Sequence, residues 1–372
     1  MKGIYFTTQY SPFRENTNVF TVGIEKKIKK QISVFEQNGY SIEVVNPEKP
    51  VHTFDKILRR LPIHYEKYDI EKTLVEDSYF MYIRKPLLID YRMIDYLSEV
   101  KKINPTIKIL MEIPTFPYDN EIKDKKDIPF LLKDRIARNQ LYKYVDVIIT
   151  YSKDSEIFGI PAINLSNGID YFELNKYTFE KNNNSKIHVI ACACFNFYHG
   201  YDRAIKGLFE YVKDNDDSGV VLDIVGDGSA LTEYKTLAHD MSLENYVVFH
   251  GQLTGEDLAR VYNTASIGLD SMGRHRAGVY YNSSLKGKEY CAYGLFIVSG
   301  VETELDNNNK FPFYYRIPAD ESPMDWSSVI SFYKKNLEDY GGADKCKAVI
   351  KDYAKCNFDM SVAFQPVIDY IG

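Results

Sequence analysis

Long apolar runs are missing from this 372-residue sequence. No stretch of eighteen apolar residues occurs, which argues against a membrane-spanning helix. The first residues, MKGIYFTTQY, already have the pattern of a β-strand and lack the charged and apolar regions of a signal peptide. We therefore expect a cytoplasmic protein.

Cysteine is also scarce, with five residues that are odd in number and have no CxxC spacing. Cys192 and Cys194 stand two apart in an apolar run, which would put both on one face of a strand. Buried thiols in a reducing compartment explain this pattern better than a disulfide or a zinc site. We expect no bound metal.

An excess of basic charge is absent, since the net charge is −6. This value argues against nucleic acid as a bulk partner. The charge is uneven: residues 1–170 hold 26 Lys and Arg against 24 Asp and Glu, and the remainder holds 20 against 28. Such basic runs usually form solvated helix faces, and a peripheral contact with the inner membrane surface is the alternative. The runs comprise Lys26, Lys27, Lys29, Lys30, Arg59, Arg60, Lys123, Lys125 and Lys126.

What the chain does contain is two successive series of apolar strands and amphipathic helices. The first opens with a strand at residues 2–7, a polar loop over 8–18, a helix over 19–38 and a strand over 41–45, and it includes a helix around 131–143. The second restarts with a strand over 187–194 and a helix from about 202 to 213. Strand, helix, strand in this order implies a parallel sheet. The fold class is therefore α/β, with two Rossmann-like domains facing one another across a cleft. The predicted parts are an N-terminal domain (1–170), a linker (171–185), a C-terminal domain (186–352) and a last helix (353–372) that packs on the N-terminal domain or on its own.

The most informative stretch runs from Asp270 to Gly294, DSMGRHRAGVYYNSSLKGKEYCAYG. It leaves an apolar strand, carries Arg274, Arg276 and Lys286, and enters a helix at Ser284. Helix N-termini and basic side chains bind phosphate groups. A solvated basic loop is the alternative, but the position at a strand end of an α/β domain favours a diphosphate site.

Three other strand ends carry candidate residues. Gly226 and Gly228, in VGDG, would let the backbone approach a ligand, although a tight strand-to-helix turn is the alternative. His199 and Arg203, in HGYDR, would lie beside the phosphate position. Glu112 directly follows an apolar strand, so it is either an acid facing the cleft or a strand-end carboxylate, and we favour the former.

The order of these motifs resembles the GT-B glycosyltransferases of family 4, in the branch associated with bacterial capsule and surface polysaccharide synthesis. The motifs are NGID (167–170), HGYDR, VGDG, VVFHGQL, LKGKEY and AYGLFIVS. The resemblance covers nearly the whole chain and is most specific in its C-terminal half. It implies a nucleotide-sugar donor on the C-terminal domain, an acceptor on the N-terminal domain, retention of the anomeric configuration and no metal.

The sequence departs from that family at several positions. Ala193 stands near the usual Arg, His199 at the usual Lys, and Tyr281 at the first acid of a pair whose second is Glu289. In the N-terminal domain, Gly23 stands where two glycines are common, and Glu112 to Thr115 occupy the region of the usual His. Either the cations have been relocated to the 274–286 loop and Arg203, or the donor site has decayed; three basic residues on one loop favour relocation.

A leaving nucleoside diphosphate gains negative charge as the sugar–oxygen bond breaks, and without Mg²⁺ fixed cations and helix amides must stabilise it. We assign this role to Arg276 and Lys286, supported by Arg274, Arg203 and the amides of Ser284 and Leu285. Glu289 would accept hydrogen bonds from ribose, the segment 249–253 would meet the base, and Glu112 would orient the sugar or the acceptor.

The sequence thus predicts a retaining glycosyltransferase that uses a UDP- or GDP-linked sugar and a saccharide or lipid-linked saccharide acceptor. It needs no cofactor besides this donor. A catalytically silent GT-B protein that stabilises another transferase is the main alternative, because the usual Arg and first Glu are missing. Another reaction of nucleotide sugars, such as epimerisation, is the third.

Overall fold

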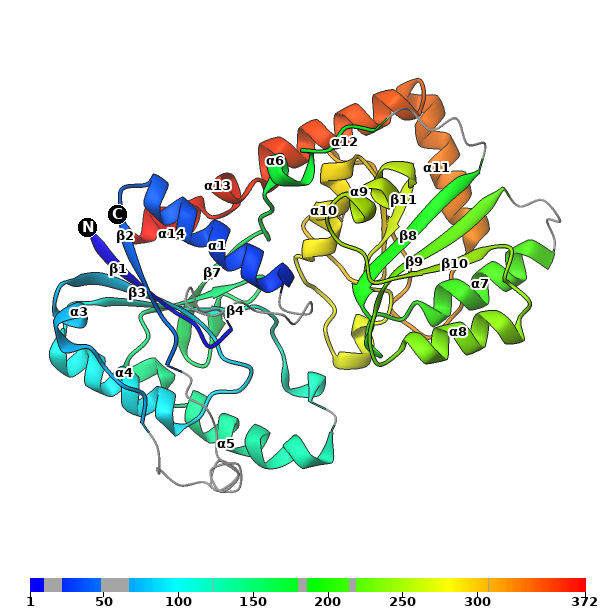
Figure 1. Ribbon diagram of the computed structural model, residues 1–372. Coiled ribbons are helices and arrows are strands. Elements are labelled where there is room, and N and C mark those ends of the chain that lie inside the picture. Colours follow the sequence, from blue (N-terminus) through cyan, green and yellow to red (C-terminus); the bar gives the residue numbers. More distant parts are fainter. Residues whose placement is uncertain (10–21, 48–66, 123, 180–185, 214–218, 307) are drawn as a thin grey trace. The chain divides into compact units, whose positions relative to one another are not determined.

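The protein contains two compact α/β units. The computed structural model describes residues 1–9, 22–47, 67–122, 124–179, 186–213, 219–306 and 308–372. The first unit comprises Met1–Leu165 and Phe364–Gly372, and the second comprises Ser166–Ala363 (Figure 1). The expected loop over 8–18, Arg59, Arg60 and Lys123 fall largely or wholly outside the described residues.

The N-terminal unit is built on a seven-stranded sheet of order β2-β1-β3-β4-β5-β7-β6. All pairings are parallel except that of β6 with β7. The strands are β1 (Lys2–Phe6), β2 (Ser41–Val45), β3 (Ser78–Arg84), β4 (Lys108–Ile113), β5 (Val147–Thr150), β6 (Glu156–Ile157) and β7 (Ile160–Asn164). The carboxyl ends of β3, β4 and β5 therefore meet at one edge, as the strand–helix–strand pattern predicts.

Helices cover the sheet of this unit. They are α1 (Val22–Gln37), α3 (Lys72–Glu76), α4 (Tyr91–Ile103), α5 (Ile128–Arg138) and, from the far end of the chain, α14 (Gln365–Ile371). Helix α4 buries Met93, Leu97 and Val100 at helical spacing, which explains why its bounds follow from the sequence. Helix α5 begins earlier than the expected residue 131, because Pro129 suits the first turn of a helix.

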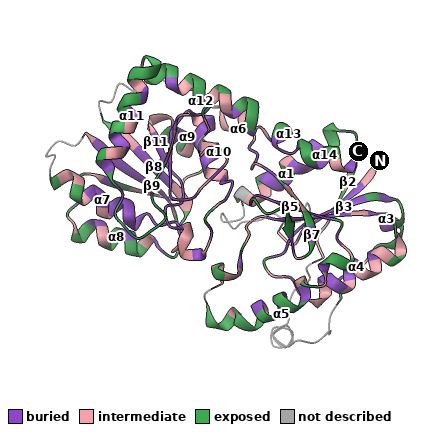
Figure 2. Cartoon of the chain, turned by 180° about the vertical axis from the view of Figure 1, so that it is seen from behind, coloured by how far each residue is buried: buried purple, intermediate pink, exposed green. Residues whose placement is uncertain are grey.

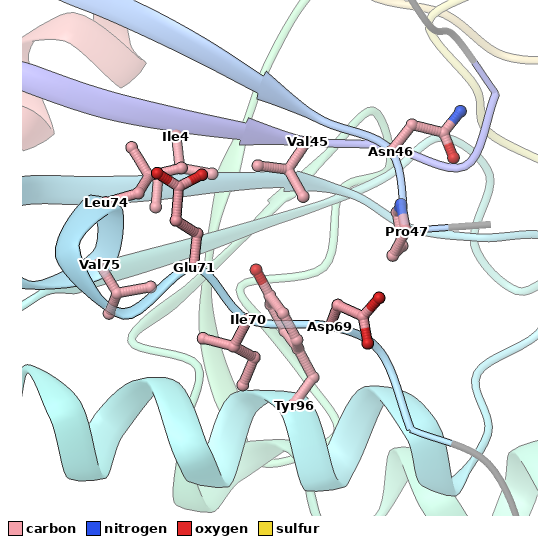
Figure 3. Close-up of a pocket in the computed structure, with 10 residues that line it drawn as sticks. All are labelled: Ile4, Val45, Asn46, Pro47, Asp69, Ile70, Glu71, Leu74, Val75 and Tyr96. Carbon is pink, nitrogen blue, oxygen red and sulfur yellow. The ribbon is translucent and has the colours of Figure 1, made fainter. Parts of the chain in front are cut away.

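A pocket of about 390 Å³ lies in the N-terminal unit beside the carboxyl end of β2 (Figure 3). Val45 of β2 and Tyr96 of α4 line it together with Asp69 and Glu71. Its charged lining groups are acids, which would repel a phosphate group. A diphosphate site is therefore not expected there.

The C-terminal unit contains a six-stranded parallel sheet of order β10-β9-β8-β11-β12-β13. Its strands are β8 (Ile187–Cys194), β9 (Val220–Asp227), β10 (Val247–Gly251), β11 (Ile267–Leu269), β12 (Phe296–Ser299) and β13 (Tyr314–Arg316). The prediction of two parallel α/β domains is confirmed. Strands β9, β11 and β12 are largely buried, and the longer helices carry both buried and exposed residues (Figure 2).

Some helices of this unit connect successive strands, and others precede or follow the sheet. They are α6 (Tyr171–Leu174), α7 (Asp202–Lys213), α8 (Leu231–Asp240), α9 (Gly255–Thr264), α10 (Leu285–Tyr293), α11 (Trp326–Tyr340), α12 (Ala343–Phe358) and α13 (Met360–Ala363). The chain leaves the N-terminal unit between Leu165 and Ser166, before the expected linker of 171–185. That segment instead opens with α6, whose first turn is capped by the Asp170 carboxylate.

The end of the chain returns to the N-terminal unit, where α14 packs. Phe364 meets the rings of Phe35 and Tyr82 at centroid distances of 5.2 and 5.5 Å. Lys108 Nζ donates to the carbonyl groups of Tyr370 and Ile371 at 3.1 and 2.8 Å, where a cation suits a helix C-terminus. The expected single helix over 353–372 is instead the last turns of α12 followed by α13 and α14.

Candidate nucleotide-diphosphate site

The candidate site lies within the C-terminal unit, at the carboxyl ends of β8, β9 and β11. These strands are parallel neighbours, so the loops that follow Cys194, Asp227 and Leu269 emerge at the same edge. The loop after β11 leads through a short 3-10 turn, Arg274–Ala277, to helix α10. This edge is where open α/β sheets bind ligands.

Asp270 joins the end of β11 to the start of α10. It is 1% exposed, and its backbone N–H donates to the Val298 carbonyl at 2.9 Å. Its carboxylate accepts a hydrogen bond from the Ser284 hydroxyl at 2.7 Å, and Lys286 Nζ lies 3.6 Å from the same oxygen. Because the Ser284 hydroxyl is used here, it does not cap the first amides of α10, although Ser284 is the N-cap residue.

A cationic cluster surrounds that helix start. The Lys286 side chain is 20% exposed, and the Arg274 guanidinium lies 4.4 Å from the centre of the Tyr198 ring. Burial lowers the pKa of Lys286; Asp270 opposes this effect and Arg274 adds to it. Two cations held together in a poorly solvated place favour the binding of an anion.

His199 contributes a neutral imidazole to the same cluster. Burial lowers the pKa of His199 well below its usual range, and the positive charges of Lys286 and Arg274 act in the same direction. Its Nδ1 accepts a hydrogen bond from the Asn196 N–H at 2.9 Å, so the proton of the neutral ring sits on Nε2. The described residues provide no acceptor for that Nε2–H group, which can donate to a phosphate oxygen.

Glu289 lies one turn further along α10 and is partly buried. Its charge acts to raise the pKa of Lys286 and of Tyr293, which places it beside the cluster. Leu285, the first residue of α10, packs against the core of the unit and thereby holds the helix start at the strand ends. Ser284, Leu285, Lys286, Glu289, Arg274 and His199 are thus gathered in one place.

Arg276 is engaged by other groups of the protein, which does not support the diphosphate role that its place in the loop suggested. Its guanidinium donates to both carboxylate oxygens of Asp202, at 2.9 and 3.0 Å, and to Glu321 at 2.6 Å. Burial would lower the pKa of Arg276, but the hydrogen bonds to Glu321 and Asp202 outweigh it and raise the pKa. Two carboxylates already neutralise this side chain, so it anchors the loop to α7.

Arg203 is fully buried and holds the fold together, which does not support its assignment to the donor. Its guanidinium donates to the carbonyl oxygens of Ser322, Met272 and Pro318. A fourth hydrogen bond goes to Asp320 at 3.2 Å. With its donors used in this way, Arg203 joins the loop after β11 to the segment that precedes α11.

The glycines of VGDG also have a structural role. Gly226 and Gly228 adopt φ values of 130° and 145°. A Cβ atom at Gly226 would lie 1.9 Å from the Ala193 carbonyl oxygen, and one at Gly228 would lie 2.3 Å from that of Phe195. The close approach that the sequence suggested is therefore an approach to the end of β8.

Glu112 is the centre of a buried network in the N-terminal unit. It is 0% exposed, and its oxygens lie 2.8 Å from Arg84 Nη1 and 3.0 Å from Lys27 Nζ. Tyr151, Tyr82 and Gln31 also donate to it. Burial would raise the pKa of Glu112, but Arg84 and Lys27 outweigh it and hold the pKa well below its usual range. The predicted role in orienting a substrate is not supported by this geometry.

Sequence reasoning missed a second buried network, which holds the residue before the α10 N-cap. The Lys288 ammonium, 1% exposed, lies 2.6 Å from the Glu304 carboxylate, which also accepts from the Ser283 hydroxyl at 2.8 Å. Asn167 donates to the Ser283 carbonyl at 2.6 Å. The motifs NGID and LKGKEY contain two of these residues, but nothing local in the sequence shows that they meet.

The arrangement of potential metal ligands and the state of the cysteines were also compared with the expectations. Among the described residues, no group of three or more His, Cys, Asp or Glu side chains is arranged to hold a metal ion. All five cysteines are free; Cys192 is partly buried and Cys194 is exposed, so the expectation of buried thiols is wrong for Cys194. No helix in the described ranges is long and apolar enough to span a membrane.

Comparison with solved structures defines the fold as GT-B. A glycosyltransferase from Rickettsia africae ESF-5 matches with a TM-score of 0.65 and 11% identity, over 100% of this chain and 97% of that one. HepE from Anabaena, solved with UDP, matches with a TM-score of 0.62 and 12% identity, over 100% and 99%. Sucrose-phosphate synthase from Thermosynechococcus elongatus gives 0.62 and 12%, over 99% and 98%.

A comparison with known sequence families matches one segment of the chain. Residues 175–269, which contain β8 to β11, match the family described as Glycosyl transferases group 1. No curated protein sequence matches this chain. The segment ends at the last residue of β11, so the cationic loop and α10 lie just outside it.

Proposed function

We propose that this protein is a glycosyltransferase that takes a sugar from a nucleoside-diphosphate sugar. The observation that carries the proposal is the cluster of Lys286, Arg274 and neutral His199 at the start of α10. The group 1 match over 175–269 and the GT-B fold support it. A saccharide or lipid-linked saccharide is the proposed acceptor, in the synthesis of a bacterial surface polysaccharide.

The diphosphate of the donor would lie against the N-terminus of α10. Lys286 and Arg274 balance its charge, the first amides of α10 donate to its oxygens, and the Nε2–H of His199 supplies a neutral donor. Glu289 accepts hydrogen bonds from the ribose hydroxyl groups. These fixed donors replace a divalent cation in this proposal, so transfer would not require metal.

The proposed reaction retains the configuration at the anomeric carbon. The bond between this carbon and the phosphate oxygen breaks, and its electron pair leaves with the diphosphate. The acceptor hydroxyl forms the new glycosidic bond on the same face, and its proton passes to the departing phosphate. The cationic cluster stabilises the negative charge that develops on the leaving group, and no side chain is needed as a general base.

Calorimetry with UDP and GDP tests the proposal. We expect one of them to bind, and Lys286→Ala to weaken its affinity by about 10- to 100-fold, the effect of a lost charge-assisted hydrogen bond. Lys310→Ala, a change at an exposed lysine of the same unit, is the matched control and should leave the affinity unchanged. Binding of neither nucleotide, or equal effects of the two variants, would exclude the proposed site.

A catalytically silent nucleotide-binding protein is the second candidate. It is favoured by one observation: Arg276 is held by Asp202 and Glu321. In addition, Tyr281 stands where family 4 enzymes have the first acid of the pair whose second member corresponds to Glu289. Incubation with UDP- and GDP-linked sugars and saccharide acceptors separates the two functions. Release of nucleoside diphosphate that Lys286→Ala abolishes identifies a transferase, whereas nucleotide binding with no turnover identifies the silent protein.

A further inference from the structure

Helix α5 exposes an apolar stripe to solvent. Ile128, Leu132 and Ile136 are 45%, 52% and 51% exposed, and they follow one another at intervals of four residues. Residues spaced in this way lie on one face of a helix. Figure 2 shows the outer side of α5 as exposed over much of its length. A surface helix normally carries polar residues there.

The opposite face of the same helix is already used. Leu131 and Ala137 are buried against the N-terminal unit, and the Asp134 carboxylate accepts from the Ile89 N–H at 2.6 Å and from the Tyr118 hydroxyl. The helix is thus anchored by one face while it presents the Ile128–Leu132–Ile136 stripe with the other. Packing within the unit does not explain the stripe.

The charges around the stripe are mostly positive. Asp134 is the one acidic residue of α5, and it is 0% exposed. Between residues 124 and 143, Asp124 is exposed and pairs with Lys126 at 2.8 Å, and Asp127, which precedes the helix, is partly buried. The exposed basic residues of the described part of this segment are Lys125, Lys126, Arg135 and Lys143. Arg135 also pairs with Asp119 at 2.8 Å.

This combination suits an anionic membrane surface better than a second copy of the chain. Three half-exposed aliphatic side chains offer far less than the roughly 800 Å² per partner of a stable protein interface. Two copies meeting through α5 would also bring Lys125, Lys126 and Arg135 against their equivalents. A layer of anionic lipid accepts both features, because aliphatic groups enter the headgroup region while Lys and Arg contact the phosphates.

We propose that α5 is a membrane-docking helix that lies parallel to the surface of an anionic bilayer. Ile128, Leu132 and Ile136 enter the boundary between headgroups and acyl chains, and the flanking cations bind lipid phosphate groups. The inference goes beyond sugar transfer and does not depend on it.

Co-sedimentation with vesicles tests the docking. The full chain is mixed with vesicles of phosphatidylcholine alone, or of phosphatidylcholine with phosphatidylglycerol. We expect binding to the anionic vesicles that weakens as salt is raised, because the basic side chains are screened. Leu132→Gln/Ile136→Gln should reduce the partition coefficient about tenfold through the loss of buried apolar surface, while helix propensity is kept.

The control replaces exposed apolar residues elsewhere. Val349→Gln/Val362→Gln changes side chains that are 42% and 47% exposed in the C-terminal unit, and it should bind vesicles as the unchanged protein does. Absence of binding to anionic vesicles, or equal losses in the two double variants, would overturn the proposal. So would sedimentation velocity that detects a dimer in the unchanged protein and a monomer in Leu132→Gln/Ile136→Gln, since a second copy would then be the occupant.

Discussion

Replacing Glu112 by glutamine tests whether this residue stabilises the fold or binds a substrate. The residue is fully buried, and its partners Arg84 and Lys27 are 5% and 8% exposed. Glu112→Gln keeps the shape but leaves two buried cations without a counter-charge. Loss of one partner from a buried ion pair costs about 3–5 kcal/mol. Tyr151 donates to one carboxylate oxygen and Tyr82 to the other. Glutamine keeps only one of these acceptors, and a lost hydrogen bond adds about 1 kcal/mol to the cost.

Urea unfolding followed by circular dichroism measures this loss. We expect a destabilisation of about 3–5 kcal/mol for Glu112→Gln and a negligible one for Glu43→Gln, an exposed acid on β2. Trp326 is the one tryptophan of the chain and lies in the C-terminal unit. Its fluorescence therefore indicates whether the loss is confined to the N-terminal unit.

The contribution of Glu112 to the free energy of unfolding should change with pH in a defined direction. The pKa of Glu112 is depressed in the folded state, so its contribution is fully present above the unfolded value of about 4.3 and fades as the pH falls below it. Glu112→Gln should lack that part of the acid dependence. A destabilisation under about 1 kcal/mol, together with loss of sugar transfer, would refute the structural role and restore the substrate-facing one.

Two further replacements test buried cations. Burial lowers the pKa of Lys85 to about 8, although Asp134 opposes this effect. In the unfolded chain the lysine keeps its proton up to about pH 10.4, so raising the pH from 8 to 10 favours the folded state. Over this range the free energy of unfolding of the unchanged protein should rise on the order of 3 kcal/mol relative to that of Lys85→Met. Urea unfolding at several pH values measures this, and a constant difference would contradict it. Glu304→Gln removes the counter-charge of buried Lys288 beside Ser283. We expect nucleotide binding measured by calorimetry to weaken about tenfold and the free energy of unfolding to fall by about 3 kcal/mol. Unchanged affinity would show that this network does not position α10.

Regular elements followed from the sequence where apolar residues repeat over several turns or a whole strand. The expected strand 187–194 and helix 202–213 coincide with β8 and α7. The expected helix over 131–143 was displaced, because α5 starts at Ile128 and ends at Arg138. The sequence predicted one last helix, whereas the structure has three, since Asp359 interrupts the helical backbone with a ψ of 139°.

Side-chain direction was harder to predict than position. Arg203 and Gly226 do lie beside the predicted site, but each meets groups that are distant in sequence, such as the carbonyl oxygens of Ser322 and Ala193. Glu112 stands at a strand end, yet α1 supplies Lys27, which pairs with it inside the unit. Lys286 and Ser284 were gathered as expected because one short helix start carries both.

The return of α14 to the N-terminal unit affects how the chain can fold during synthesis. Ile371 is fully buried there, and Phe364 fills a place beside Phe35. A ribosome has therefore produced the whole C-terminal unit before the N-terminal unit receives its last helix. The first unit to be translated is the last to be completed, and the incomplete unit exposes the apolar surface that Phe364 and Ile371 later cover. A fragment of residues 1–165 would carry that same exposed surface permanently.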